Sequence, residues 1–382
     1  MQVKTHPLVS PATGTQRQVI SWHYGAADAP GPHVYLQASL HADELPGMLV
    51  LQHLKHLLDA ADASGQIKGR VTVVPVANPI GLDQTLMYAQ LGRFELGSGK
   101  NFNRHYPNLA AIITPMIADQ LGSDAQQNTR IIRDAMHAWL RAQTPRSELE
   151  SLRNTLLDLA VDADVVLDLH CDFEAVMHLY VEAPYLVQAE PLMRHMRAET
   201  VLWANDDVDA TMVGDLSGGL CFDEALSSVW WRLRAAFPQL PIDLACLSST
   251  IELRGQQDVS HALAGMDAQN LMAYFKHIQV IDGTPDPLPP ALCHATPLAG
   301  SETLEAPHPG VLVYLKQVGE RVKVGDAVAQ IVEPFTGKTT DICATVAGTL
   351  YARQVLRWAT TGLDIGKIAG SEAFKTGQLL SA

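Results

Sequence analysis

The sequence has few of the features that mark secreted or membrane proteins. Its five cysteines, Cys171, Cys221, Cys246, Cys293 and Cys343, are scattered and odd in number, which indicates a reducing compartment and not a disulfide framework. No apolar run approaches the ~20 residues that span a bilayer, and the N-terminal stretch lacks the apolar core of a secretion signal. We therefore expect a cytoplasmic protein with no membrane partner.

Cationic residues are also scarce. The chain has 27 Lys and Arg against 41 Asp and Glu, a formal net charge of −14, and no basic stripe that would pair with phosphates. This excludes a nucleic-acid partner and is compatible with a cationic or zwitterionic small molecule. With 382 residues, 47% of them hydrophobic and 18% charged, the sequence is typical of a soluble enzyme with more than one domain.

Short β-type runs alternate with segments of helical period over most of the chain. Strands are expected over 16–24 (an edge strand), 33–40, 71–77, 164–168, 176–182 and 249–253. Helices are expected over 45–60, 109–163 with a break near 122–127, 186–202, 222–236 and 262–280. A long polar loop, 78–108, separates two of these units, and loops of that length are usually functional. The alternation predicts the α/β class, with a mixed sheet flanked by helices.

The composition changes after residue 283. We expect a catalytic domain over 1–283, a proline-rich linker over 284–300 and a small all-β domain, similar to a barrel-sandwich, over 301–382. The glycine-punctuated repeat in this last domain resembles the biotinyl/lipoyl-carrier fold. The Met-Lys-Met and Asp-Lys-Ala hairpins of those carriers are missing, and Lys338 lies in a Thr-Gly-Lys-Thr run instead. We therefore expect a structural β-domain and not an acyl or biotin carrier.

Two polar clusters follow predicted buried strands. His41 and Glu44 follow the run 33–40, and His170 ends the run that contains Asp168. Strand ends of an open α/β sheet share one edge, where ligands bind. Hydrolytic zinc sites use three His or Glu ligands and leave one position open for water. The spacing predicts a metal site formed by His41, Glu44 and His170.

A hydrolase of this kind also needs a base and a donor for the oxyanion. Glu252 lies within an apolar strand run, where a carboxylate is costly to bury without a role. The alternative is an ion pair between Glu252 and Arg254. In the long loop, Arg93 and the Asn103-Arg104 pair can bind an oxyanion or a carboxylate. Loop capping or a surface ion pair is the alternative for these three residues.

The order of these motifs is similar to that of a known family. HxxE at 41–44, NxNR at 101–104, DLH at 168–170 and IE at 251–252 resemble the succinylglutamate desuccinylase/aspartoacylase family of the zinc carboxypeptidase superfamily. The resemblance covers most of residues 33–255 and implies a zinc-carboxypeptidase-like fold with a trailing β-domain. It implies hydrolysis of an amide bond of a small amino acid, with a zinc-bound water as the attacking group.

The resemblance also implies a role for each candidate residue. These roles are zinc ligand for His41, Glu44 and His170, general base for Glu252, oxyanion donor for Arg93, and substrate-carboxylate clamp for Asn103 and Arg104. We expect one Zn²⁺ per chain, which cobalt or manganese can replace in vitro. Whether the chain assembles as a homo-oligomer stays open.

The substrate follows less directly from the sequence. Asp172 lies beside the predicted metal site, and a loop with four aspartates spans Asp206–Asp215, so a cationic substrate end is our leading hypothesis. The strings around the motifs resemble a bacterial branch that uses cyanophycin dipeptides, which implies hydrolysis of β-aspartyl-arginine. The alternatives are an N-acyl-amino-acid deacylase, a catalytically inactive binding protein and a carboxypeptidase that acts on longer peptides.

Overall fold

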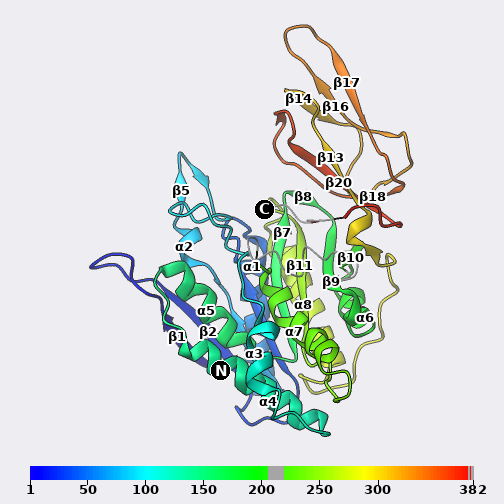
Figure 1. Cartoon of the computed structure of the whole chain (residues 1–382). Helices are drawn as coiled ribbons and strands as arrows, with labels where there is room; N and C mark the ends of the chain where they lie inside the picture. Colours follow the sequence, from blue (N-terminus) through cyan, green and yellow to red (C-terminus); the bar gives the residue numbers. More distant parts are fainter. Residues whose placement is uncertain (205–218, 377–378, 380–382) are drawn as a thin grey trace.

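A computed structural model describes residues 1–204, 219–376 and 379 of the chain. Its main feature is a nine-stranded mixed sheet in the order β1-β2-β4-β3-β7-β11-β9-β10-β12 (Figure 1). These strands are β1 (Gln2–Pro7), β2 (Gln18–Tyr24), β3 (His33–Ala38), β4 (Arg70–Val74), β7 (Val165–Asp172), β9 (Met177–Glu182), β10 (Thr200–Ala204), β11 (Leu247–Gly255) and β12 (Thr296–Pro297). The α/β class is confirmed.

Helices cover both faces of this sheet. One face packs against α1, α6 and α8, and the other packs against α3, α4, α5 and α7. The helices are α1 (Pro46–Ala63), α2 (Pro79–Leu82), α3 (Leu109–Ile117), α4 (Ala125–Ala142), α5 (Glu148–Ala160), α6 (Leu186–His195), α7 (Phe222–Ala236) and α8 (His261–His277). Alternate side chains of each central strand enter different cores, as the two-residue period of a strand requires. Leu169 and Leu253 face α1 and α8, so their neighbours His170 and Glu252 face the α7 side.

The strand directions place the predicted motifs at one edge of the sheet. β3, β7 and β11 are parallel neighbours, so their C-terminal ends lie side by side. β9 runs antiparallel to β11, which brings the beginning of β9 to the same edge. Register pairs on adjacent strands share a face, so His170, Glu252 and His178 form a row across β7, β11 and β9.

Three expectations about elements are wrong. The strand near 16–24 is not at the edge, because β1 pairs outside β2; β1 is almost wholly exposed and therefore has no hydrophobic pattern to detect. The helix expected over 186–202 ends at His195, and β10 follows it after Arg197, whose positive φ of 59° turns the chain. The segment 109–163 forms three helices, since a second break follows Ala142.

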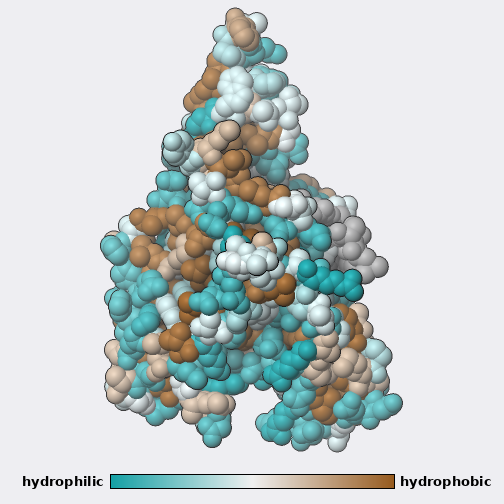
Figure 2. Space-filling view, turned by 90° about the vertical axis from the view of Figure 1, so that its left-hand side faces the viewer, coloured by the Kyte–Doolittle hydropathy of each residue, from teal (hydrophilic) through white to brown (hydrophobic). Residues whose placement is uncertain are grey.

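The C-terminal β region, residues 301–370, forms two further antiparallel sheets around its own apolar core. One sheet has the order β13-β20-β18-β15 and the other β17-β16-β14-β19. The strands are β13 (Ser301–Glu305), β14 (Gly310–Tyr314), β15 (Arg321–Val322), β16 (Ala327–Val332), β17 (Thr339–Cys343), β18 (Gly348–Arg353), β19 (Trp358–Ala359) and β20 (Asp364–Gly370). In the space-filling view this region rises as a narrow cone from a wider body (Figure 2).

The C-terminal β region is attached to the main sheet at two places. The two-residue strand β8 (Glu174–Ala175) pairs with β18, and the Glu174 carboxylate lies 2.6 Å from Nε of Arg353. On the other side, β12 lies within the expected linker and joins β10, and Arg194 donates hydrogen bonds to the carbonyls of Pro289 and Leu288. The division of the chain at 283 and 300 stays a prediction.

Candidate active site

One cavity brings together the eight residues that the sequence predicts as metal-binding, catalytic or substrate-binding. It lies at the carboxyl edge of β3, β7 and β11, and the C-terminal β region forms one of its walls. Its lining includes His41, Glu44, Arg93, Asn103, Arg104, His170, Asp172 and Glu252. The acidic loop expected over Asp206–Asp215 lies outside the described residues.

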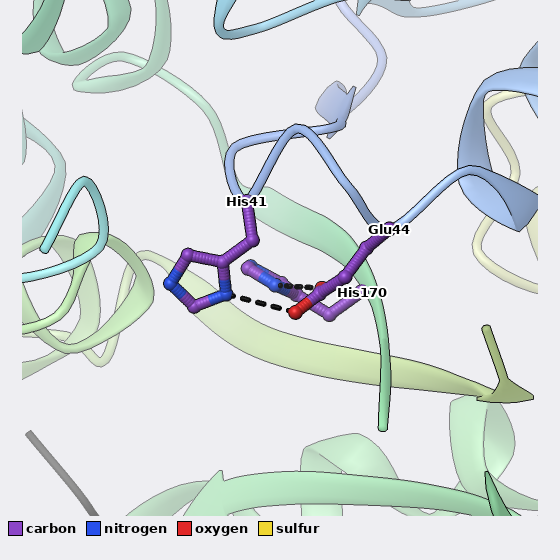
Figure 3. Close-up of side chains that lie close together, drawn as sticks. All are labelled: His41, Glu44 and His170. Carbon is purple, nitrogen blue, oxygen red and sulfur yellow. Dashed lines mark hydrogen bonds and ion pairs between the residues drawn. The ribbon is translucent and has the colours of Figure 1, made fainter. Parts of the chain in front are cut away.

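The metal corner, which we define as His41, Glu44 and His170, is built on two neighbouring strand ends. His41 and Glu44 lie in the turn between β3 and α1, and His170 lies on β7 (Figure 3). A side chain at Gly47 would meet Ala38 at 2.9 Å and Leu169 at 3.1 Å. Glycine there lets the first turn of α1 approach β3 and β7, and so brings Glu44 beside His170.

The donor atoms of the metal corner point at one another. Nδ1 of His41 lies 3.0 Å from Oε1 of Glu44, and Nδ1 of His170 lies 2.8 Å from Oε2 (Figure 3). One ligand atom from each residue can be chosen so that all three lie within 4.8 Å of one another. All three residues are at least 95% buried, which makes this a closed and preformed cluster. Two imidazoles and a carboxylate are the donor set that suits zinc.

The outer nitrogens of both imidazoles also have partners. Nε2 of His41 lies 2.9 Å from Oδ1 of Asn101, and Nε2 of His170 lies 3.0 Å from Oδ2 of Asp168. A histidine that binds a metal through Nδ1 donates its other N–H to such a group, which fixes its tautomer and orientation. Gln37 in turn donates to Oδ1 of Asp168. The residues present therefore fit a metal bound through Nδ1 of both histidines and Glu44.

The charges of the metal corner are balanced internally. Burial opposes ionisation of Glu44, but His41 and His170 outweigh it and hold the pKa of that carboxyl well below its usual range. Burial and the nearby Arg93 lower the pKa of His41 to about 4. Burial also opposes charge on His170, but Asp168 and Glu44 raise its pKa well above the ordinary value.

Glu252 stands beside the metal corner on β11, in register with His170. Burial, and then repulsion from Glu44, raises the pKa of Glu252 to about 8. Its Oε2 is buried with no hydrogen-bond partner among the described residues. The alternative partner from the sequence, Arg254, pairs with Asp267 of α8 instead. Glu252 is therefore a carboxyl group in the cavity with an open position for a proton.

The three residues of the long loop reach the cavity from one side. Nη1 of Arg93 lies 3.3 Å from Oε1 of Glu44, and a Cβ at Gly92 would meet Asp43 N at 2.1 Å, so only glycine allows this approach. Oδ1 of Asn103 accepts a hydrogen bond from Phe222 N at the start of α7. Arg104 donates to the carbonyl of Asn103. Both residues are thus held at the N-terminus of α7.

Sequence reasoning missed an acidic cluster beside this loop, which we define as Glu182, Asp223 and Glu224. Asp223 and Glu224 lie in the first turn of α7, Glu182 ends β9, and all three line the cavity. Burial raises the pKa of each: to about 8 for Glu182, well above the usual range for Glu224, and upward for Asp223. The neighbouring Arg232 lowers the pKa of Glu182 and Glu224, but burial and mutual repulsion outweigh it. In the sequence these residues look like ordinary capping carboxylates.

A cation from the C-terminal β region was missed as well. Lys367 on β20 lines the cavity, and its Nζ lies 2.9 Å from Oδ2 of Asp172. Tyr351 on β18 lines the same wall and hydrogen-bonds to Tyr180 of β9. No local pattern could have shown that residues almost 200 positions apart meet here, because the contact depends on how β18 docks on β8.

Comparison with known proteins agrees with this geometry. Residues 30–214 match the model of the succinylglutamate desuccinylase/aspartoacylase catalytic domain. The resemblance to the succinylglutamate desuccinylase/aspartoacylase family is thereby confirmed. At the level of that family, the match indicates a hydrolase of N-acyl amino acids. No curated protein matches the chain.

Solved structures show the same fold over nearly the whole chain. A candidate succinylglutamate desuccinylase/aspartoacylase from Shewanella frigidimarina NCIMB 400 is 24% identical, with a TM-score of 0.83 and 97% of each chain covered. A candidate member of the same family from Shewanella amazonensis SB2B is 24% identical, with a TM-score of 0.82 over 97% of this chain and 98% of that one. The product-bound ectoine utilization protein EutE (DoeB) from Ruegeria pomeroyi is 16% identical, with a TM-score of 0.63, and the match covers 96% and 95%. These likenesses confirm the fold as a mixed sheet flanked by helices with an added all-β region.

No helix among the described residues is both long and apolar enough to cross a membrane.

Proposed function

We propose that the protein is a zinc-dependent hydrolase that cleaves β-aspartyl-arginine to aspartate and arginine. The observation that carries the substrate is the acidic cluster beside Asn103 and Arg104. A carboxylate clamp and a group of buried carboxyl groups with raised pKa values then line the same cavity as the metal corner. An arginine leaving group fits both features, because its α-carboxylate can bind the clamp and its cationic side chain can bind the acidic cluster.

The raised pKa values support a cationic ligand over a neutral one. Arg232 is the cation that acts on Glu182 and Glu224, while His170 and a hydrogen bond with Thr250 act on Asp223, and burial outweighs these partners for all three carboxyl groups. A guanidinium or ammonium bound there would favour the ionised carboxylates and remove much of this electrostatic penalty. Capping of α7 does not explain the cluster, because one carboxylate is enough to cap a helix and burial of the others costs free energy.

The remaining residues have roles that follow from their positions. Zinc, when held by the metal corner, supplies Lewis acidity to the scissile carbonyl and acidifies a water. Glu252, with its open oxygen, takes the proton of the attacking water and passes it to the leaving amine. Arg93 donates to the oxygen that becomes negative, and Asn103 with Arg104 holds the α-carboxylate of the leaving amino acid.

A product assay tests this proposal directly. Zinc-loaded protein is incubated with β-aspartyl-arginine, N-succinylglutamate or N-acetylaspartate, and the free amino acids are measured by mass spectrometry. We expect wild type to release arginine and the Glu252→Gln variant to be at least ~10³-fold slower, because it cannot accept the proton. Asp119→Asn, an exposed change on the described surface, is the matched acidic control and should leave the rate unchanged.

Two outcomes would contradict the proposal. Turnover of N-succinylglutamate or N-acetylaspartate without turnover of β-aspartyl-arginine would keep the reaction class and reject the substrate. Equal turnover by wild type and Glu252→Gln would reject the role of the base.

An N-acyl-amino-acid deacylase is the second candidate. Lys367 favours it, because a cation in the cavity can hold the carboxylate of a succinyl group. The acidic cluster favours the dipeptide, because glutamate and aspartate as leaving groups bring no cation to it.

A further inference from the structure

The far wall of the cavity holds one matched ion pair, Lys367 and Asp172, which we call the charge pair. Nζ of Lys367 lies 2.9 Å from Oδ2 of Asp172, while Oδ1 of Asp172 accepts a hydrogen bond from Phe173 N. The Lys367 side chain is 30% exposed and that of Asp172 12%, and both line the cavity. The ammonium has three donors and each carboxylate oxygen has two lone pairs, so both groups retain hydrogen-bonding capacity toward a ligand.

The charge pair lies on the opposite side of the metal corner from the acidic cluster. Along β11, Thr250 hydrogen-bonds to Asp223, Glu252 comes next, and Gly255 pairs with Asp172. Asp172 follows His170 by two residues on β7, and side chains so spaced lie on one face about 6.5 Å apart. A substrate whose leaving group contacts the acidic cluster therefore extends its acyl group toward Lys367.

We propose that the charge pair binds the free amino-acid head group of the acyl residue, with Lys367 donating to its α-carboxylate and Asp172 accepting from its α-ammonium. This rests on the proposed function and narrows it. A pair with no net charge complements a zwitterion better than a succinyl group, which can pair with Lys367 but brings nothing for Asp172, or an acetyl group, which brings no charge. The C-terminal β region then supplies Lys367 as a residue that selects the acyl group of the substrate, in addition to forming a wall of the cavity.

The C-terminal β region is attached to the main sheet by several contacts besides the charge pair. β8 pairs with β18, Val176 N donates to the carbonyl of Tyr351, and Glu174 contacts both Arg353 and Arg357. Neutral variants of the charge pair should therefore keep the wall in place. The double variant Lys367→Met with Asp172→Asn leaves no unpaired charge and guards against a folding defect in the single variants.

Four arginine derivatives isolate the two contacts. β-Aspartyl-arginine has both head groups, β-alanyl-arginine lacks the carboxylate, succinyl-arginine lacks the ammonium, and propionyl-arginine lacks both. We expect Lys367→Met to lower kcat/KM ~10- to 100-fold for the two derivatives with the carboxylate, and to change the other two less than ~3-fold. Asp172→Asn should act on the two derivatives with the ammonium. Lys338→Met, at an exposed turn, is the matched control.

A uniform loss across all four derivatives in either variant would show a structural role and overturn the inference. Equal cleavage of propionyl- and β-aspartyl-arginine by wild type would overturn it too, while the proposed arginine specificity would stand.

A binding measurement keeps the inference testable if no arginine derivative is cleaved. Free aspartate carries the head group alone, so its effect does not depend on the acidic cluster. We expect millimolar aspartate to raise the melting temperature of the zinc-loaded wild type more than succinate does, and to have no effect on the double variant. The same shift in wild type and double variant, or no shift in wild type, would overturn the inference whatever the leaving group.

Discussion

The metal corner and the acidic cluster are both groups of buried ionisable side chains in one cavity, yet their charges are balanced in opposite ways. Each oxygen of Glu44 contacts an imidazole, and the pKa of Glu44 falls. Glu182 and Glu224 repel each other and meet too little positive charge, and their pKa values rise. The carboxylate of the metal corner is thus already balanced by positive charge within the protein. The carboxyl groups of the acidic cluster lack such a balance, and this is why we propose that they bind a cationic part of the substrate.

The strongest way to break this comparison is to remove one member of the metal corner. We expect His170→Ala to lose bound metal and to lower kcat at least ~10³-fold, because two remaining ligands cannot hold zinc in a hydrolytic site. Metal content by mass spectrometry and arginine release measure the two effects together. His53→Ala, a change outside the cavity, is the control. One metal per chain in His170→Ala would show that the three residues do not act as a unit.

Neutral variants of the acidic cluster should separate stability from activity. We expect Asp223→Asn and Glu224→Gln to lower kcat/KM for β-aspartyl-arginine ~10- to 100-fold, because a charge-assisted contact is lost. The same variants should raise the melting temperature of the substrate-free protein by ~1–3 °C, because repulsion is relieved. Glu44→Gln should lower it instead. A lower melting temperature in the cluster variants would mean that these carboxylates already have enough partners.

The smallest expected effect is on the pH dependence of stability, where Glu182 and Glu44 should act in opposite directions. The pKa of Glu182 is raised to about 8 in the folded protein, so the stability it contributes is present below its unfolded pKa of ~4.3 and is lost as pH rises toward 8. Glu44 has a depressed pKa, so its contribution is present above the unfolded pKa and is lost as pH falls. Calorimetry of metal-free protein between pH 5 and 8 should show a fall in melting temperature that Glu182→Gln reduces. An unchanged slope would contradict the raised pKa.

The sequence predicted the metal corner because its information is local. His41 and Glu44 are three residues apart after a buried run, and Asp168 with His170 ends another, so strand ends alone bring them together. The long loop was informative for the same reason, since its glycines and polar residues leave few core positions, of which Phe102 and Tyr106 are two.

The other wall of the cavity could not be predicted from local patterns. Glu182 and Asp223 come from elements that meet only when α7 packs across β9, and Lys367 arrives through the pairing of β18 with β8. β1 was missed for a related reason, because an exposed strand at the sheet edge has no apolar period. Contacts that depend on tertiary packing leave little trace in composition or spacing.

The attachment of the segment before the C-terminal β region bears on how substrates enter. Arg194 and Arg197 donate to the carbonyls of Leu288, Pro289 and Pro290, and β12 is a strand of the main sheet. With β8 pairing on the opposite side, the C-terminal β region, which roofs the cavity, is attached to the main sheet at two places. A polymer would need that roof to lift, whereas a molecule of dipeptide size does not. Under the proposed function, we therefore expect the protein to cleave dipeptides and to leave longer peptides intact.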